Sequence, residues 1–89
     1  MEIRHLRLIK AIVEEGSITQ AMNVLHLSQS ALSYQLKEAE LQIGTQVFYR
    51  RNKKLILTPV GKKLYSTAEK VLKELDMTDA EIKKMVNGE

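Results

Sequence analysis

The feature that most constrains the fold is a run of helix-forming sequence that begins at Thr58-Pro59 and continues to about Asn87. Threonine is a favoured N-cap residue, and proline is favoured at the first helical position because its missing N–H costs nothing there. No glycine or proline interrupts residues 62–86. At 1.5 Å per residue the predicted helix is roughly 40 Å long, which is long for a chain of 89 residues.

A 3.5-residue repeat places a stripe of mostly apolar side chains along this helix. The dimerisation residues that it predicts are Leu64, Ala68, Val71, Leu75, Ile82 and Met85. The residues that precede the helix are too few to cover the whole stripe, so we expect the same helix of a second copy to cover part of it. The alternative, a helix folded back as a hairpin within one chain, lacks a loop-like sequence. We therefore predict a homodimer formed through residues 59–88.

Length and composition limit the chain to one domain, which must be stabilised by side-chain packing and not by disulfide bonds. The chain is 44% hydrophobic, 28% charged and 4% aromatic, which is too apolar for a disordered chain. It has no cysteine, and no apolar run approaches the roughly 20 residues that a membrane span needs. The two histidines, His5 and His26, lie 21 residues apart. We expect a cytoplasmic protein without a membrane segment, a metal site or a cofactor.

Apolar spacing predicts three shorter helices before the long one. They are expected over residues 3–15, from residue 18 to about 25, and over residues 29–43. Ser17 and Ser28 are favoured N-caps of the second and third helices, and either could also contact a phosphate. Gly16 and Gly44 are natural ends of the first and third helices. His26 falls in the tight turn between the second and third helices, where it can cap or pack.

The net charge of +3 is concentrated in a predicted hairpin. Residues 47–50 and 55–58 are short β-prone runs that flank a polar, basic tip. Residues 47–63 contain six Lys and Arg residues and no acid, whereas the rest of the chain sums to −3. Two short helices joined by a tight turn, followed by a basic hairpin, are typical of a winged helix-turn-helix. We predict this mainly α fold, three helices plus a two-stranded wing, over residues 1–58, followed by a linker and dimerisation helix over residues 59–89.

Small polar residues at the start of the third helix suit the major groove of DNA, which admits one α-helix. The predicted DNA-binding residues are Ser28, Gln29, Ser30, Ser33, Tyr34 and Lys37 of the third helix, and Arg50, Arg51, Lys53 and Lys54 of the wing. The wing cations would meet phosphates or the minor groove. Other roles stay open at this stage: Gln29 and Ser33 could be ordinary solvated residues, Tyr34 could pack on its neighbours, and Arg50 could pair with Glu40.

Enzyme motifs are missing from the sequence. It contains no Gly-rich phosphate loop, nucleophile elbow or H-E-x-x-H pattern, so we expect no enzyme. The alternative to a sequence-specific, double-stranded-DNA-binding transcriptional regulator is a winged-helix module that binds protein. A protein-docking helix would expose apolar or acidic side chains rather than Gln, Ser and Tyr beside a basic wing, so the charge pattern favours DNA.

The sequence resembles the N-terminal DNA-binding domain of LysR-type transcriptional regulators. The matching segments span essentially the whole chain and include Ile3-Arg4-His5-Leu6, Gly16-Ser17-Ile18-Thr19-Gln20-Ala21, Ser28-Gln29-Ser30-Ala31-Leu32-Ser33 and Leu57-Thr58-Pro59-Val60-Gly61. The resemblance implies a third helix in the major groove, a wing that touches the minor groove through Lys53, and a linker helix that pairs two subunits. The chain departs from the family pattern at Ser30, often proline, and at Lys53, often arginine.

Within the family, the Ser28–Ser33 segment followed by Tyr34 looks most like the branch that regulates methionine biosynthesis. Family members normally carry a further domain that binds a small-molecule co-inducer. The resemblance therefore implies that this chain is a piece of a longer regulator, that the effector-binding domain is absent from it, and that a co-inducer is a partner only of the longer chain.

Overall fold

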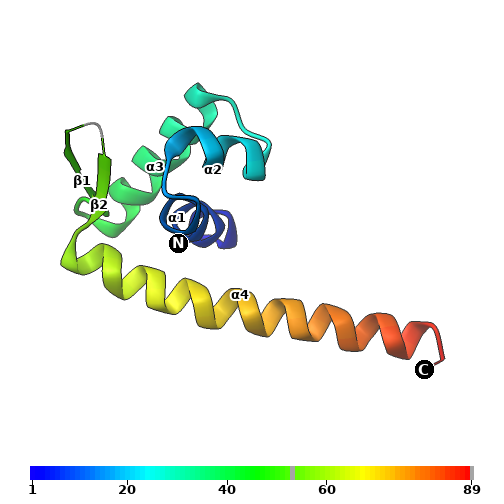
Figure 1. Ribbon diagram of the computed structural model, residues 1–89. Helices are drawn as coiled ribbons and strands as arrows, with labels where there is room; N and C mark the ends of the chain where they lie inside the picture. Colours follow the sequence, from blue (N-terminus) through cyan, green and yellow to red (C-terminus); the bar gives the residue numbers. More distant parts are fainter. Residues whose placement is uncertain (53, 89) are drawn as a thin grey trace.

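The computed structural model describes residues 1–52 and 54–88. Within these residues the elements follow the order α1 (Ile3–Glu15), α2 (Ile18–Leu25), α3 (Gln29–Ile43), β1 (Phe48–Arg51), β2 (Lys54–Leu57) and α4 (Pro59–Val86). The molecule measures 51 × 24 × 19 Å, because α4 runs beneath the other helices and extends past them (Figure 1). The mainly α winged helix-turn-helix predicted from the sequence is confirmed.

Capping residues define where the helices begin and end. The hydroxyls of Ser17, Ser28 and Thr58 each accept the backbone N–H three residues later, at 3.0–3.1 Å. Gly16 ends α1 in the left-handed conformation, which favours glycine. His26 ends α2 in the same conformation, with φ 56°. These caps turn the chain tightly between α1, α2 and α3, which sets the geometry of the helix-turn-helix.

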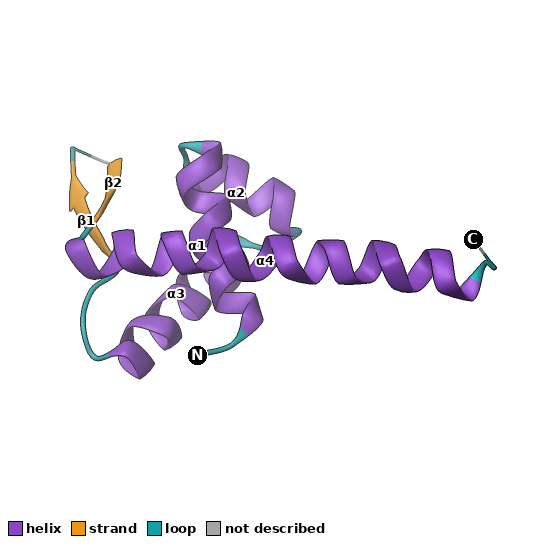
Figure 2. Cartoon of the chain, turned by 90° about the horizontal axis from the view of Figure 1, so that it is seen from below, coloured by secondary structure: helices purple, strands orange, loops and turns teal. Residues whose placement is uncertain are grey.

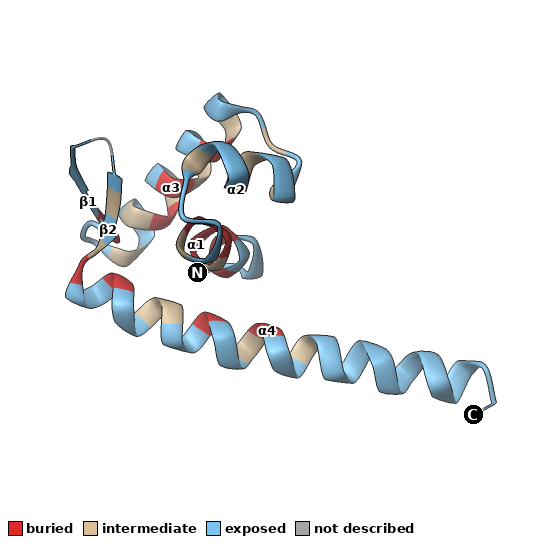
Figure 3. Ribbon diagram, viewed as in Figure 1, coloured by how far each residue is buried: buried red, intermediate tan, exposed pale blue. Residues whose placement is uncertain are grey.

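The core lies between α1, α2, α3 and the wing. The largest fully buried side chains are Leu8, Ile9, Leu32, His5 and Val47. Leu32, Leu36 and Ala39 lie on the buried face of α3, so the opposite face of this helix is left to solvent. Figure 3 shows the same division, with the buried residues on the inward faces of the helices.

The wing is an antiparallel pair whose register runs from Phe48–Leu57 at its base to Arg51–Lys54 at its tip. Compared with the predicted runs, β1 begins and ends one residue later and β2 begins and ends one residue earlier. Val47 lies outside β1 because its N–H bonds to the carboxylate of Glu40, at 2.7 Å. Thr58 lies outside β2 because it caps α4. The buried ring of Phe48 holds the base of the wing against the core.

The first half of α4 crosses α1 and packs against it (Figures 1 and 2). Leu6 of α1 forms a buried cluster with Ala68 and Leu72, and Val71 and Leu75 pack against its edge. From Asp76 onward every described residue of α4 is exposed. Figure 2 shows this half of the helix projecting beyond the domain, with the wing at the opposite end. Despite the length of α4, no helix among the described residues is apolar enough to cross a membrane.

This packing corrects part of the predicted dimer stripe. Ala68 is fully buried within its own chain, so it is not available to a second subunit. Leu64, Val71 and Leu75 also pack on their own domain, although part of each stays exposed. Helical periodicity predicts the stripe, but it cannot tell whether α1 of the same chain or a helix of another chain covers it.

Candidate nucleic-acid interface

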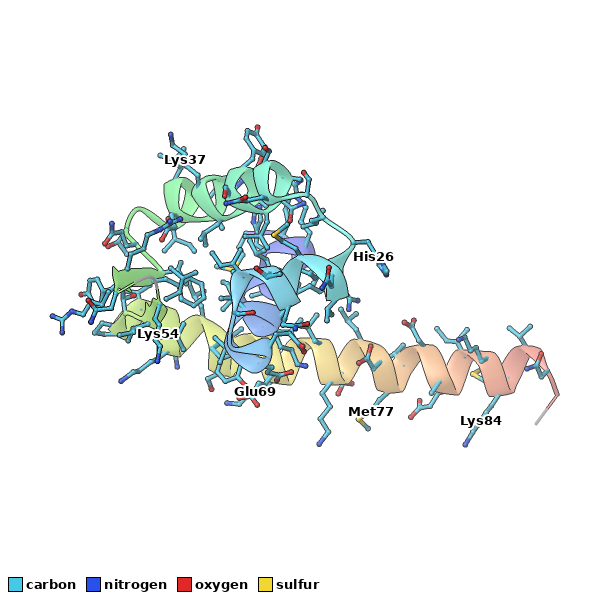
Figure 4. The ribbon with its side chains drawn as sticks, turned by 45° about the horizontal axis from the view of Figure 1, so that its top comes forward. His26, Lys37, Lys54, Glu69, Met77 and Lys84 are labelled. Atoms are coloured by element: carbon cyan, nitrogen blue, oxygen red, sulfur yellow. The ribbon has the colours of Figure 1, made fainter. Side chains whose placement is uncertain are left out.

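The outer face of α3 presents all the polar side chains that the sequence singled out on this helix. Ser28, Gln29, Ser30, Ser33 and Lys37 are exposed, and Tyr34 is 66% exposed. Lys37 points away from the body of the domain (Figure 4). The exposure of Tyr34 argues against the alternative in which its ring packs on neighbours. A helix face of small and amide side chains with one ring is therefore open to a ligand.

The wing adds a basic edge beside this face. Arg50, Arg51 and Lys54 are exposed. Arg51 and Lys54 lie opposite each other in the strand register, at the tip of the hairpin. Lys53, also predicted to bind DNA, lies outside the described residues. The alternative in which Arg50 pairs with Glu40 is not what the structure shows, because the Glu40 carboxylate bonds to the N–H of Val47.

A groove of about 790 Å³ joins the wing to the helix-turn-helix. Its polar lining consists of Ser17, Thr19, Gln29, Lys54 and Lys62, above an apolar floor that includes Phe48. Ser17 and Thr19 stand at the start of α2, where free backbone N–H groups attract anions. Of these residues, the sequence predicts DNA contact for Gln29 and Lys54 and leaves a phosphate contact by Ser17 open. The acid-free stretch of residues 47–63 was a sequence signal for Lys62, whereas no comparable signal pointed to Thr19.

A polar cluster that sequence reasoning missed fixes α3 on α1. His5 is fully buried; its Nε2 lies 2.8 Å from Oε1 of Glu38, and its Nδ1 accepts the N–H of Glu2 at 3.3 Å. A neutral ring that donates at Nε2 satisfies both bonds. Arg4 Nη2 donates to the same Glu38 oxygen. The hydrogen bond from His5, with the charge of Arg4 beside it, lowers the pKa of Glu38 below its ordinary value of 4.5.

This cluster also contains the atoms that a metal ion would need. Ligand atoms of Glu2, His5 and Glu38 lie within 4.8 Å of one another. Arg4 Nη2, however, lies 3.0 Å from the Glu2 carboxylate and 2.6 Å from that of Glu38. The guanidinium already supplies the positive charge that the two carboxylates attract, and Glu38 already occupies Nε2 of His5. The cluster is therefore complete as a set of ion pairs, and its role is to orient α3.

A second contact at the surface links α1 to α4. The Tyr65 hydroxyl donates to Oε2 of Glu14 at 3.2 Å, and Lys10 donates to Oε1 at 2.8 Å. The bond from Lys10 lowers the pKa of Glu14, and desolvation together with Glu14 raises the pKa of Tyr65. These bonds flank the apolar packing of α1 on α4 and leave the outer face of α3 free.

The fold and this exposed face define the class of protein: a winged helix-turn-helix with a long C-terminal helix. A family model described as "Bacterial regulatory helix-turn-helix protein, lysR family" matches residues 3–62. The chain belongs to this family, as its sequence motifs predicted.

Curated relatives include proteins named "HTH-type transcriptional regulator MetR". That of Salmonella typhimurium is 39% identical over 75 residues, which are 84% of this chain and 24% of the relative. The regulator BenM of Acinetobacter baylyi is 36% identical over 89 residues, which are 100% of this chain and 29% of the relative. The chain thus spans less than a third of the length of either relative.

Solved structures show the same architecture. A complex of the BenM DNA-binding domain with catB site 1 DNA matches with a TM-score of 0.90 and 36% identity, covering 100% of both chains. Full-length BenM matches with a TM-score of 0.83 and 37% identity over 93% of this chain and 27% of that one. The position of α4 relative to the helix-turn-helix therefore has counterparts in crystal structures.

Proposed function

We propose that this chain binds duplex DNA sequence-specifically and serves as the DNA-binding part of a transcriptional regulator. The observation that carries this proposal is the exposed polar face of α3 beside the basic edge of the wing. The similarity to a BenM domain whose structure is titled as a DNA complex supports it further. An α-helix fits the major groove, and amide and hydroxyl groups at its start reach base edges.

Each exposed group has a role in this arrangement. The Gln29 amide offers the donor and acceptor that match the edge of adenine, whereas Ser30 and Ser33 donate or accept as the base requires. Tyr34 contributes its hydroxyl or packs on a thymine methyl group. Ser28, at the start of α3, and Lys37 contact phosphates, which fix the register of the helix.

The wing contributes affinity more than sequence preference. Arg50, Arg51 and Lys54 meet phosphates or the minor groove, and Lys53 is assigned to the same role from the sequence alone. The groove between wing and helix-turn-helix is lined by further donors, including Lys62 and Thr19. A phosphate backbone that follows this groove would place the outer face of α3 over the bases.

We also propose that the functional unit is a homodimer formed through residues 59–88. Ile82, Met85 and Val86 are 50%, 76% and 79% exposed on the part of α4 that has left the domain. Leu64, Val71, Leu75, Ile82 and Val86 follow one another at intervals of 7, 4, 7 and 4 residues, so the apolar face that packs on α1 continues past it. A second α4 would cover this continuation.

Residues 1–58 would then read DNA and residues 59–89 would pair the subunits. A two-fold dimer reads two half-sites of related sequence, so the operator would be roughly palindromic. The cytoplasm is the compartment that this role requires. A small-molecule co-inducer is proposed only for a longer chain, since the curated relatives are much longer than this one.

Selection of bound duplexes from a random pool tests the proposal. We expect enrichment of an inverted repeat whose half-sites are separated by about one helical turn or a multiple of it. A double variant, Gln29→Ala with Ser33→Ala, should lose the enriched sequence while remaining folded. A folded chain that enriches no sequence over the starting pool would refute specific DNA binding and would favour the protein-binding alternative.

A further inference from the structure

We propose that Glu40, Thr58 and Gly61 are positioning residues that lock α4 to the wing and to α3 through the backbone of Val47. Through this junction, the direction in which α4 leaves the domain would set the distance between the two half-sites that a dimer reads. The inference rests on the proposed function and adds to it a determinant of operator spacing.

The junction gathers three elements around one buried residue. The Val47 N–H donates to the carboxylate of Glu40, which belongs to α3, at 2.7 Å. The Val47 carbonyl accepts the N–H of Thr58 at 3.0 Å. The Thr58 hydroxyl lies 2.8 Å from the carbonyl oxygen of Gln46 and 3.2 Å from that of Val47, and it accepts the Gly61 N–H at 3.0 Å. Val47 is fully buried and Thr58 is 4% exposed, so the bonds of the Thr58 hydroxyl to Val47 and Gly61 are shielded from water, whereas those to Glu40 and Gln46 are partly buried.

Gly61 explains how α4 comes so close to Val47. A Cβ at Gly61 would lie 2.1 Å from the Val47 carbonyl oxygen and 2.9 Å from Cδ2 of Leu57. Gly61 lies within the first turn of α4, where alanine would be favoured by about 1 kcal/mol on helix propensity alone. The backbone at Gly61 has none of the positive φ values found at Gly16 and Gly44. Close approach, rather than backbone conformation, therefore accounts for the glycine.

The long helix amplifies a small change at this point. A Cβ at Gly61 must move from 2.1 Å to at least 3.0 Å from the carbonyl oxygen, so the first turn of α4 and the Val47 backbone must separate by about 1 Å. If α4 pivots at the buried Ala68, about 10 Å along the helix, its end near Ile82 moves about 2 Å in the opposite direction. Two subunits together would change the separation of their reading helices by about 4 Å, close to the 3.4 Å rise of one base pair.

The test uses the half-site that the wild-type chain selects, placed twice in duplexes that differ only in the spacing between the copies. We expect Gly61→Ala and Thr58→Val to shift or broaden the preferred spacing by about one base pair, with affinity for a single half-site within about twofold of wild type. Thr58→Ser retains the hydroxyl and should restore the wild-type spacing. Gly16→Ala is the matched control, because it strains a left-handed glycine that has open space around it and does not touch the junction.

Wild-type spacing in folded Gly61→Ala and Thr58→Val would overturn the inference while leaving the proposed function intact. An equal shift in Gly16→Ala would also overturn it, because general destabilisation would then be sufficient. If Gly61→Ala does not fold, as judged by circular dichroism, the Thr58→Val and Thr58→Ser pair decides. A wild-type chain that selects no duplex refutes DNA binding itself, and one that binds without any spacing preference refutes the dimer and with it this inference.

Discussion

The salt dependence of DNA binding measures how much the wing cations contribute to the affinity of this chain for DNA. Arg51 and Lys54 are exposed and paired across the end of the hairpin, so a double change to alanine removes two charges without opening the core. Each cation that neutralises a phosphate contributes about 0.9 to the slope of log affinity against log salt concentration. The double variant should therefore bind with a slope that is shallower by about 1.8.

This slope change corresponds to a large difference in affinity. Between 50 and 200 mM salt the wild-type chain should lose about 12-fold more affinity than the variant, because a fourfold rise in salt multiplies the slope difference by about 0.6 in log units. Fluorescence anisotropy with a labelled duplex, selected by the wild-type chain, measures both slopes. The preferred sequence should stay the same, because phosphate contacts carry no base information.

Lys83 and Lys84 offer a matched control at the other end of the molecule. Both lie in the last turn of α4, and Figure 4 shows Lys84 far from the wing. Replacing both by alanine removes the same charge, and exposed sites of this kind change stability by about 0.5 kcal/mol or less. The wing assignment is wrong if the Arg51 and Lys54 variant keeps the wild-type slope, or if the Lys83 and Lys84 variant flattens it equally.

Three further changes test other parts of the structure. Gln29→Ala should weaken binding to the selected duplex by about 1–3 kcal/mol and relax preference at one position per half-site. Fluorescence anisotropy measures this loss, with Gln42→Ala at the exposed end of α3 as control. An equal loss of affinity for scrambled DNA would contradict base contact by Gln29. Ile82→Glu with Met85→Glu should convert the dimer into a monomer, as measured by sedimentation, because charges would enter an apolar contact. The control, Lys83→Ala with Lys84→Ala, should stay dimeric. A glutamate variant that is still a dimer would show that Ile82 and Met85 lie outside the interface. Glu38→Gln should reduce the acid sensitivity of folding: the lowered pKa of Glu38 stabilises the fold above pH 4.5, and this contribution is lost as pH falls through the folded-state pKa. Urea unfolding between pH 7 and 3 measures the difference, with the exposed Glu15→Gln as control; identical pH profiles for wild type and Glu38→Gln would show that the His5 and Arg4 contacts do not stabilise the carboxylate.

Local chemistry accounts for what the sequence predicted well. Ser17, Ser28 and Thr58 cap helices where each was expected to do so, because an N-cap needs only a hydroxyl and the N–H groups that follow it. The buried face of α3 follows from the spacing of Leu32, Leu36 and Ala39, and the exposed face follows by exclusion. Most of the candidate site lies on this exposed face, so helical periodicity was enough to find it.

Contacts between distant segments could not be predicted in the same way. The bond between His5 and Glu38 joins residues 33 positions apart, and in sequence Glu38 is one of many helix-surface acids. Glu40 could be expected to meet Arg50 by charge, but the nearer N–H of Val47 takes the carboxylate. Ala68 could belong to a dimer or to a domain, and only the crossing of α1 over α4 assigns it to the domain. In each case the partner is selected by the arrangement of the helices, which single-residue patterns do not specify.

Helix α4 takes part in both proposed activities, DNA binding and dimerisation. Because Gly61, Ala68 and Leu72 are buried against the domain, the first half of α4 cannot reorient without breaking the packing that holds α1, and the Val47 junction holds its start. The second half carries Ile82, Met85 and Val86 to the surface as part of the same helix. A partner subunit that binds those residues is therefore connected to the helix-turn-helix by one continuous helix and not by a flexible linker. Operator spacing in this chain should for that reason respond to substitutions at residue 61 more strongly than to polar substitutions on the exposed side of α4, such as Glu74→Gln.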